Sequence, residues 1–305
     1  MKSIYYTCLI ILLTITNNTL INYRSSLDSN RVCSSGKNQS PINLIEGQSA
    51  YNPSIAFLSD DYQVITQNLT LDGFIGYVYT ITAPAGSNFG SIYLTKDGYL
   101  TKNILTQITI NFPSEHTIAG VPGDLEVKLI HQRVLDYKSD VNTNRQLTNV
   151  NPFFSISVLF KRGASYPSDQ GFLNNLFPGW QSMVNSPYFQ NVYNINLDIN
   201  KYGLMRGKKF YYYEGSHTYI PCDEDMSTIV ISEFVNMPDN FYTFIYNQMN
   251  IRYLNGNGNK NIAAISGRPI YRNYITDSES AALNSSSYGL RYCICIIGMI
   301  LLALL

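Results

Sequence analysis

The chain has 305 residues, enough for one large domain or two small ones, and 45% of them are hydrophobic while 14% are charged. This composition excludes a disordered chain, because it supplies enough apolar side chains for a sizeable core. Lysine plus arginine and aspartate plus glutamate both number 21, so no net charge draws the chain toward nucleic acid. The sequence also contains no P-loop glycine pattern and no CxxC zinc pair.

Residues 1–22 have the form of a secretory signal peptide. Lys2 precedes an apolar run that stops at NNT and is too short to span a bilayer. We expect cleavage near residues 19–23, although NNTLINY has no clean small-x-small site. An uncleaved anchor is the alternative.

Residues 23–280 contain no linker, repeat or low-complexity segment and are expected to form one domain. Apolar or alternating runs indicate strands with buried faces. These runs begin at residues 76, 104, 125, 153, 192 and 227, and read GYVYTITA, ILTQITINF, LEVKLIH, FFSISVLFK, VYNINLDI and STIVISEF. Turn sequences such as KDG, VPGD and NGNGN separate them or lie in the loops. The pattern favours a β-dominated α/β fold with a single large mixed sheet and a few short helices.

The best helix candidate is PDNFYTFIYNQM, residues 238–249. Asp239 is expected to cap this helix at its N-terminus. A helical period would place four side chains on one side, those of Phe241, Phe244, Ile245 and Gln248.

Residues 281–305 have the order of a glycosylphosphatidylinositol anchor signal. Small residues at the expected attachment site, Asn284, Ser285 and Ser286, precede a short spacer and a tail that is apolar from residue 293 to the end. That tail is shorter than the ~20 residues of a helical span, and no charge follows it. We expect a lipid-anchored protein on the extracellular face of the cell surface. A short tail anchor is the alternative.

The five cysteines are Cys8, Cys33, Cys222, Cys293 and Cys295. Removing the two end segments leaves Cys33 and Cys222, an even number in an oxidising compartment. A bridge between them would close a loop of almost 190 residues. Sequons at Asn38 and Asn68 are compatible with glycosylation on the same route, although folding can hide Asn38.

Four segments, in the right order, resemble the α-carbonic anhydrase family. CSSGKNQSPINL from residue 33 is similar to the N-terminal signature of extracellular members, and SEHTIAGVPGDLEVKLIHQ from residue 114 to the SEH…ELHLVHW segment. YYYEGSHTYIPC from residue 211 resembles the Tyr…GSLTTPPC active-site floor, and SGRPIYRN from residue 266 the closing Asn-aromatic-Arg-Pro segment. The resemblance implies one domain on a large twisted, mostly antiparallel sheet, with a disulfide between Cys33 and Cys222.

The resemblance also implies a zinc site in which three histidines come from two neighbouring strands. Two ligands are separated by one residue, because side chains alternate along a strand. The corresponding positions here are Thr109, Asn111 and Lys128. Threonine and asparagine are weak neutral ligands, and a protonated lysine has no lone pair. We therefore expect no zinc, no other cofactor and no carbonic anhydrase catalysis.

Parts of the catalytic setting are retained as vestiges. Glu115 and Thr218 match the pair that orients zinc-bound hydroxide in the family, and Glu126 matches the carboxylate that orients a ligand histidine. Tyr219 replaces a smaller threonine, and Phe74 aligns with the proton-shuttle histidine. Without a metal, Glu115 and Thr218 are expected to hold the loop together.

The chain has three histidines, of which His116 and His131 match structural histidines of the family and are expected to be buried and satisfied. His217 replaces a leucine near the funnel floor, so its ring can point into the pocket. An improvised metal site formed by all three is the alternative, without support from their spacing.

Two conformations are open to Lys128. Its ammonium can enter the space vacated by zinc, with oxygen acceptors from Glu126, Asn111 and Thr109, or it can extend to the funnel mouth. In the first case one cation replaces another and keeps the core from collapsing.

We therefore expect a catalytically inactive surface protein that acts as a binding, adhesion or structural module for a protein or glycan partner. The basic sequence RGKKF at residue 206 is a local patch that a charged glycan can use, although such patches are commonly solvated loops. The alternative is a surface carbonic anhydrase with a displaced metal site. Metal-free hydrolysis has no Ser/His/Asp arrangement to support it.

Overall fold

The computed structural model describes most of the chain between the two ends. The described residues are 33, 35–70, 78–134, 151–163, 171–183, 192–205, 207–219, 221–253 and 259–281. The expected signal peptide, the residues proposed for lipid attachment and Phe74 lie outside them. No helix within the described ranges is long and apolar enough to cross a membrane.

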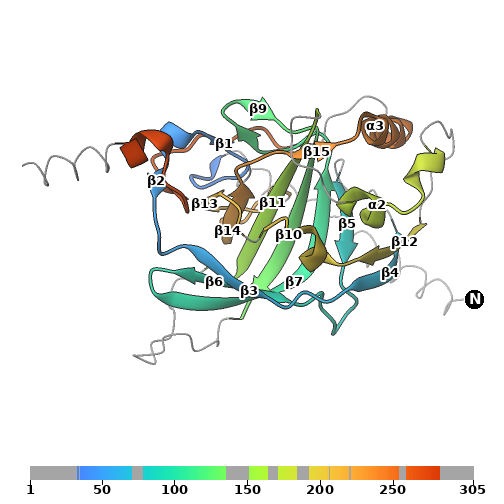
Figure 1. The fold of residues 1–305 in the computed structure, drawn as a ribbon, viewed down its shortest axis with the longest axis horizontal. Helices are drawn as coiled ribbons and strands as arrows, with labels where there is room; N and C mark the ends of the chain where they lie inside the picture. Colours follow the sequence, from blue (N-terminus) through green and yellow to red (C-terminus); the bar gives the residue numbers. More distant parts are fainter. Residues whose placement is uncertain are drawn as a thin grey trace, which may run out of the picture.

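Strands dominate the described part of the chain, with short α-helices and 3-10 helices (η) between them (Figure 1). In chain order the elements are β1 (Asn43–Leu44), η1 (Glu46–Gln48), β2 (Ala50–Tyr51), β3 (Ala56–Asp60), β4 (Ile65–Thr70), β5 (Val78–Thr82), β6 (Ser91–Lys96), β7 (Tyr99–Asn111), β8 (Thr117–Ile118), β9 (Val121–Pro122), β10 (Leu125–Arg133), β11 (Phe153–Arg162), α2 (Phe172–Leu176), η2 (Trp180–Met183), β12 (Val192–Leu197), η3 (Ile199–Tyr202), β13 (Phe210–Gly215), β14 (Met226–Ile231), β15 (Val235–Met237), α3 (Asp239–Tyr253) and β16 (Ile270–Arg272).

One 11-stranded sheet organises the domain, with the order β2-β16-β13-β14-β11-β10-β7-β6-β3 and with β15 and β5 paired to β11 and β7. Most neighbours are antiparallel, and the parallel pairs are β11–β14, β11–β15 and β16–β2. The predicted β-dominated domain on a large, twisted, mostly antiparallel sheet is therefore confirmed. In the described residues, each predicted run overlaps a strand of this sheet or, for residues 192–197, of the separate β12–β4 pair.

The central strands divide their side chains between the two faces of the sheet. On β10, Leu125, Val127 and Leu129 enter the main hydrophobic core, while Glu126 and Lys128 point to the opposite face. The neighbouring β7 and β11 alternate in the same way, because successive side chains on a strand point in opposite directions. A buried polar face thus lies directly behind a mainly apolar core.

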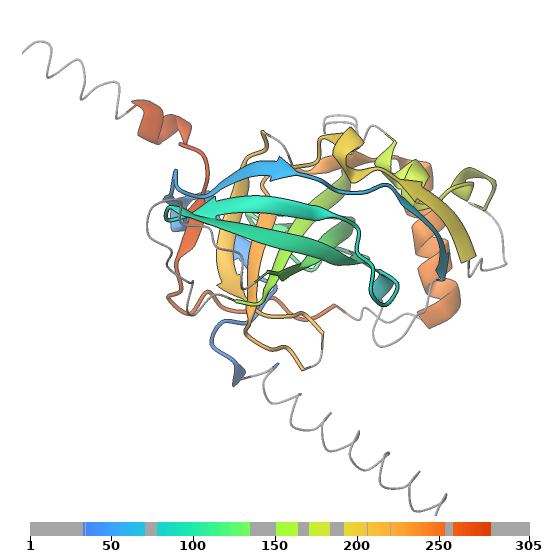
Figure 2. The same ribbon diagram turned by 90° about the horizontal axis from the view of Figure 1, so that it is seen from below.

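Helices cover one end of the main core, where α2, α3 and the β12–β4 pair lie together (Figures 1 and 2). Phe241, Phe244 and Ile245 of α3 are buried there, as the helical period predicts. The helix begins at Asp239, and the amide of Tyr242 donates to the carbonyl of Pro238. The prediction that Asp239 is the cap is therefore wrong, because Pro238 takes that position and Asp239 lies in the first turn.

A disulfide joins Cys33 to Cys222 across a sequence separation of 189 residues, which confirms the predicted pairing. It ties the N-terminal segment to the loop after β13. The side chain of Gln39 reinforces this junction by donating to the Cys222 carbonyl and to Glu224. The loop that carries His217 and Thr218 is therefore held at its far end by a covalent bond.

Candidate functional site

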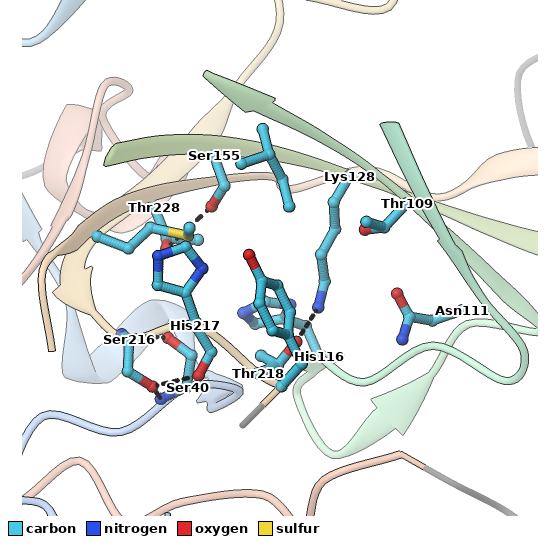
Figure 3. A pocket seen from close by; sticks show the side chains of 13 residues that line it. Ser40, Thr109, Asn111, His116, Lys128, Ser155, Ser216, His217, Thr218 and Thr228 are labelled. Carbon is cyan, nitrogen blue, oxygen red and sulfur yellow. Dashed lines mark hydrogen bonds between the residues drawn. The ribbon is translucent and has the colours of Figure 1, made fainter. Parts of the chain in front are cut away.

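A pocket lies on the polar face of the large sheet, behind the main core (Figure 3). The space between its side chains, including the solvent-open mouth, measures about 380 Å³. Most of the residues around it are polar, although the surface open within it is mostly apolar; they include Thr109, Asn111, Lys128, Ser155, His217, Thr218 and Thr228. Sequence segments from β7, β10, β11, β14 and the loop after β13 therefore meet at this point.

Strand register brings together the three positions that the resemblance assigns to zinc ligands. In the antiparallel pair of β7 and β10, Lys128 is opposite Thr109 and Glu126 is opposite Asn111. Residues directly opposite one another project from the same face of a sheet. Thr109, Asn111 and Lys128 accordingly all line the pocket.

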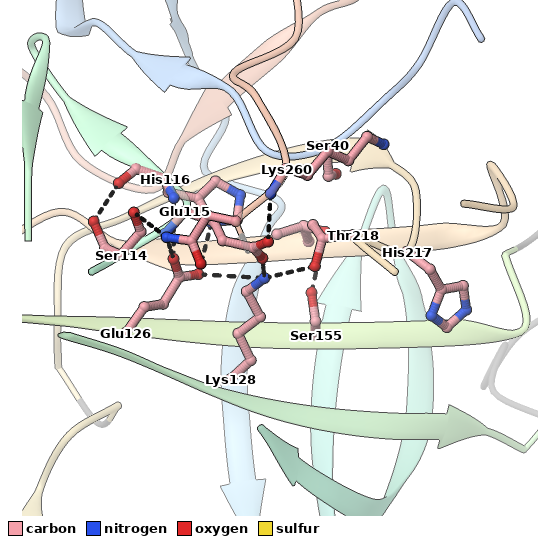
Figure 4. A network of polar contacts seen from close by, with 12 residues as sticks. Ser40, Ser114, Glu115, His116, Glu126, Lys128, Ser155, His217, Thr218 and Lys260 are labelled. Atoms are coloured by element: carbon pink, nitrogen blue, oxygen red, sulfur yellow. Dashed lines mark hydrogen bonds and ion pairs between the residues drawn. The ribbon is translucent and has the colours of Figure 1, made fainter. Parts of the chain in front are cut away.

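Lys128 is buried at the base of the pocket, with its side chain 6% exposed. Its ammonium donates to a carboxylate oxygen of Glu115 and, at 2.9 Å, to the hydroxyl of Thr218. An oxygen of Glu126 lies 3.9 Å away (Figure 4). The side chain therefore turns inward, and the extended conformation toward the funnel mouth is wrong.

The acceptors of this ammonium differ from those expected. Glu115 and Thr218 accept its hydrogen bonds, whereas Asn111 has no hydrogen-bond partner through either amide atom. Asn111 lines the pocket from the end of β7 and makes no hydrogen bond to the lysine. Lys128 thus bridges Glu115 and Thr218, which the sequence had predicted to hold the loop together between themselves.

The charges in this cluster stabilise one another against burial. Burial alone would lower the pKa of Lys128, but the carboxylates of Glu115 and Glu126 outweigh it and raise the pKa. Burial would likewise raise the pKa of Glu126, but His116 and Lys128 hold it well below its usual range. Both groups are therefore charged at neutral pH.

Glu126 organises the turn before β10. One of its oxygens accepts hydrogen bonds from the backbone amides of Glu115 (2.8 Å) and His116 (3.0 Å). Its other oxygen pairs with Nδ1 of His116 at 2.7 Å, and Nε2 of that ring lies 2.6 Å from the Tyr213 hydroxyl. The prediction that His116 is a buried, satisfied histidine is confirmed.

His131 is also buried and satisfied, on the other side of the sheet. Its Nε2 lies 2.8 Å from the Tyr62 hydroxyl, and its Nδ1 lies 3.2 Å from the carbonyl of Phe154. Burial lowers the pKa of His131 to about 3, so the ring is neutral at physiological pH. This prediction is confirmed as well.

His217 lines the pocket between the rings of Phe153 and Tyr219, as its sequence position suggested. Its Nε2 is 3.3 Å from an oxygen of Asp225, while its Nδ1 is buried without a hydrogen-bond partner. Burial lowers the pKa of His217, although Asp225 and Asp223 oppose the shift. Its neighbour Tyr219 lines the mouth and is 43% exposed.

The residues of the pocket do not fit zinc. The three histidines have separate partners, and no three His, Cys, Asp or Glu side chains in the described ranges are placed to hold a metal ion. Lys128 brings an ammonium to the position of the third ligand, where a zinc ion would meet a positive charge. An improvised site of three histidines gains no support from this arrangement.

Lys260 is a member of the charged cluster that sequence reasoning missed. Its backbone amide donates to Glu115 at 3.2 Å, and its ammonium donates to the side chain of Gln39. Burial lowers the pKa of Lys260 to about 8, while Glu115 and Glu224 oppose the shift. No local signal identifies this residue, because its contacts lie more than 140 residues away in sequence.

The predicted modification sites are only partly described. Asn38 is exposed, and its backbone amide donates to Glu224 at 2.7 Å. Asn68 lies on β4 opposite Asn194. Glycosylation of both asparagines stays a prediction, as does lipid attachment at residues 284–286.

Two lysines of the basic sequence RGKKF have neighbours within the domain. The ammonium of Lys208 lies 4.0 Å from Glu233, and that of Lys209 lies over the ring of Tyr274.

Comparison with known proteins gives a consistent result. The model of the family described as eukaryotic-type carbonic anhydrase matches residues 25–272. Dioscorin DB3L of Dioscorea polystachya is 27% identical over 203 residues, which are 67% of this chain and 64% of that protein. A carbonic anhydrase of Neisseria gonorrhoeae is 27% identical over 205 residues, 67% of each chain. The match thus spans just under two thirds of the dioscorin.

Solved structures give the same fold at lower identity. Dioscorin complexed with ascorbate superimposes with a TM-score of 0.59 and 22% identity, covering 80% of this chain and 89% of that one. The α-carbonic anhydrase from Thermovibrio ammonificans, in complex with the inhibitor sulfanilamide, gives a TM-score of 0.58 and 22% identity, covering 80% and 90%.

Proposed function

Because this chain belongs to the eukaryotic-type carbonic anhydrase family, we propose that it is a zinc-free member that does not hydrate carbon dioxide. In this proposal it serves as a binding, adhesion or structural module on the cell surface. Family membership gives the fold, and the composition of the pocket supports the proposed loss of catalysis.

One observation carries the loss of catalysis. The ammonium of Lys128 forms a buried ion pair with Glu115 and donates to Thr218, the two residues that would otherwise orient zinc-bound hydroxide. A zinc ion in the pocket would have to displace that charge and leave Glu115 with a different partner. The reaction needs a metal-activated hydroxide, so a pocket with this arrangement has no nucleophile to offer.

The sequences of residues 1–22 and 281–305 support a proposal for the location of the protein. We propose that residues 1–22 direct it to the secretory pathway and that residues 281–305 are exchanged for a glycosylphosphatidylinositol lipid at Asn284, Ser285 or Ser286. The disulfide between Cys33 and Cys222 suits an oxidising compartment. Partners on this side of the membrane are a surface protein or a glycan.

Release by a phospholipase tests the anchor. Phosphatidylinositol-specific phospholipase C added to intact expressing cells is expected to release the protein into the medium, because the lipid would be its membrane attachment. A protein with a retained tail anchor would stay on the cells, and that result would contradict the lipid anchor.

Carbon dioxide hydration tests the loss of catalysis. The protein, dialysed against zinc and then freed of excess metal, is expected to hydrate carbon dioxide no faster than buffer alone. The second candidate function, a surface carbonic anhydrase with a displaced metal site, predicts zinc-dependent turnover that a chelator abolishes. That candidate requires a ligand set that the described residues do not bring together.

A further inference from the structure

Two side chains in the pocket have hydrogen-bonding atoms without partners. Both amide atoms of Asn111 are unpaired although the residue is 1% exposed, and Nδ1 of His217 is unpaired at 7% exposure. Buried polar groups in folded proteins are nearly always hydrogen-bonded, and each exception carries a desolvation cost. Figure 3 shows the two residues on opposite sides of the pocket, with Lys128 between them.

The amide of Asn111 requires a partner that both donates and accepts. Its oxygen accepts hydrogen bonds and its nitrogen donates them, at neighbouring positions. Two adjacent hydroxyl groups satisfy this pair at once, because each hydroxyl can act in either direction. A carboxylate or phosphate only accepts, so it would leave the oxygen of Asn111 unpaired.

The charges around the pocket disfavour an ionic ligand. The ammonium of Lys128 is already compensated by Glu115, and Glu126 lies within 4 Å of it. An anion would therefore lie near two buried carboxylates, and a cation would lie near Lys128. His116 also lines the pocket and is paired with Glu126. Apart from Lys128, His116, Asn111 and His217, the polar side chains of the lining carry hydroxyl groups, among them Thr109, Ser155 and Thr228.

The mouth of the pocket offers an aromatic surface. Tyr219 lines the pocket and is 43% exposed, and its ring contacts that of His217 with 5.0 Å between centroids. A tyrosine ring presents an apolar face beside a polar tip, which suits a ligand with C–H groups on one side and hydroxyls on its edge.

We infer that the pocket binds an uncharged molecule with adjacent hydroxyl groups, either a free polyol or the terminal sugar of a glycan. The hydroxyl pair contacts Asn111, a further hydroxyl contacts His217, and the remainder of the ligand packs against Tyr219. This inference rests on the proposed function, because a zinc site would occupy the same space.

Direct binding to the full-length protein tests the inference. The probes are glycerol, myo-inositol, glucose, galactose and mannose, measured by saturation-transfer NMR and calorimetry, followed by an array of neutral glycans. At least one probe is expected to bind, and its deoxy analogue lacking one hydroxyl of the adjacent pair is expected to bind about tenfold more weakly. Binding of the small probes identifies a free polyol or sugar, whereas binding on the array alone identifies a glycan terminus.

Two variants and one control separate recognition from folding. Asn111→Ala is expected to weaken binding of the probe about tenfold or more while the protein stays folded, because it removes groups that are unpaired without ligand. His217→Phe is expected to weaken binding of the probe independently, because it removes the imidazole nitrogen that is unpaired without ligand. Ser157→Ala is the matched control and is expected to bind normally: its hydroxyl is equally buried and unpaired, but Ser157 does not line the pocket.

The outcomes distinguish this inference from the proposed function. A zinc-free protein that binds none of the probes or glycans would overturn the inference and leave the proposed function intact. Binding that survives both Asn111→Ala and His217→Phe would also overturn it, because the ligand would then occupy another place. A protein that holds zinc tightly in the pocket would overturn both the inference and the proposed function.

Discussion

The side chain of Lys128 is surrounded by groups that depend on its charge. Glu115 and Glu126 are both buried, with side chains 2% and 0% exposed, and the lysine is a cationic neighbour of each. Removal of one partner from a buried ion pair leaves the other charge desolvated without compensation, which is costlier than removal of both. The pair is therefore expected to act as a unit.

Lys128→Met is expected to lower the free energy of unfolding by about 3–5 kcal/mol, because it retains the apolar stem but leaves Glu115 uncompensated. Urea denaturation measures the change. Lys201→Met, at an exposed site on η3, is the control and is expected to change stability little. Adding Glu115→Gln to Lys128→Met should recover part of the loss, and a Lys128→Met protein as stable as its parent would show that the ammonium is dispensable.

His131 gives the stability a defined pH dependence. Its folded pKa of about 3 lies below the ordinary value of 6.5, because burial disfavours the charged ring. As the pH falls below about 6.5, the unfolded chain binds a proton that the folded chain does not, so stability is lost toward pH 3 and is fully present above 6.5. The loss approaches ~1.4 kcal/mol per pH unit.

Urea midpoints measured at intervals from pH 7.5 to 5 are expected to fall in the parent and to fall less steeply in His131→Gln, because the variant lacks the titrating ring. The pKa of His217 is also lowered by burial, so the urea midpoint of the variant should still depend on pH to some extent. Parallel slopes for the two proteins would contradict the assignment of this proton uptake to His131.

For single side chains, the sequence predicted features that depend on nearby residues but not the contacts made with residues far away in the chain. The predicted place of Lys128 at the third ligand position depends on its spacing to His116, a local feature that the sequence contains. Of its two acceptors, Glu115 is close in sequence, but Thr218 comes from a loop 90 residues away. The direction of a long flexible side chain depends on such three-dimensional neighbours. Lys260 was missed for the same reason.

Among the elements, β7 and β10 determine which side chains share the pocket. Their register places Thr109 opposite Lys128, and Asn111 follows two residues later on the same face of β7. This geometry predicts that three histidines at these positions would converge, because alternate residues of one strand and the facing residue of its neighbour share one face.

The triple variant Thr109→His, Asn111→His and Lys128→His is therefore expected to bind about one equivalent of zinc, measured by plasma mass spectrometry after dialysis. The matched control is Thr109→His with Asn111→His, which retains the lysine and should hold far less, because it lacks one ligand and keeps a repelling charge. A triple variant that folds with the near-ultraviolet spectrum of its parent but takes up no zinc would contradict the assignment of these positions.

The strands with clear alternation were predictable, and the hairpin between β6 and β7 was not. Apolar period-two patterns identified β10 and the second half of β7, because one face of each meets the core. The long β7 begins at Tyr99, five residues before the predicted run, in a hairpin closed by Asp97 and Gly98 with positive φ angles of 53° and 82°. The sequence KDG predicted a turn here but did not indicate which strands the turn joins.

For the whole molecule, one sheet and one disulfide connect parts of the chain that lie far apart in sequence. The bridge from Cys33 to Cys222 closes a loop of 189 residues, for which chain entropy alone gives roughly 5 kcal/mol of stabilisation as an upper figure. The sequence predicted the fold class and this pairing because family motifs occur in order along the chain. It could not predict the ligand of the pocket, because unpaired groups such as the Asn111 amide become visible only in three dimensions.

The content of zinc in the purified protein is the measurement that tests the central claim most directly. After mild zinc loading and removal of free metal, plasma mass spectrometry is expected to find less than about a tenth of an equivalent, because Lys128 already supplies a positive charge at the position of the third ligand. Close to one tightly held equivalent would contradict the account, since it would mean that the chain has a metal site formed by other residues.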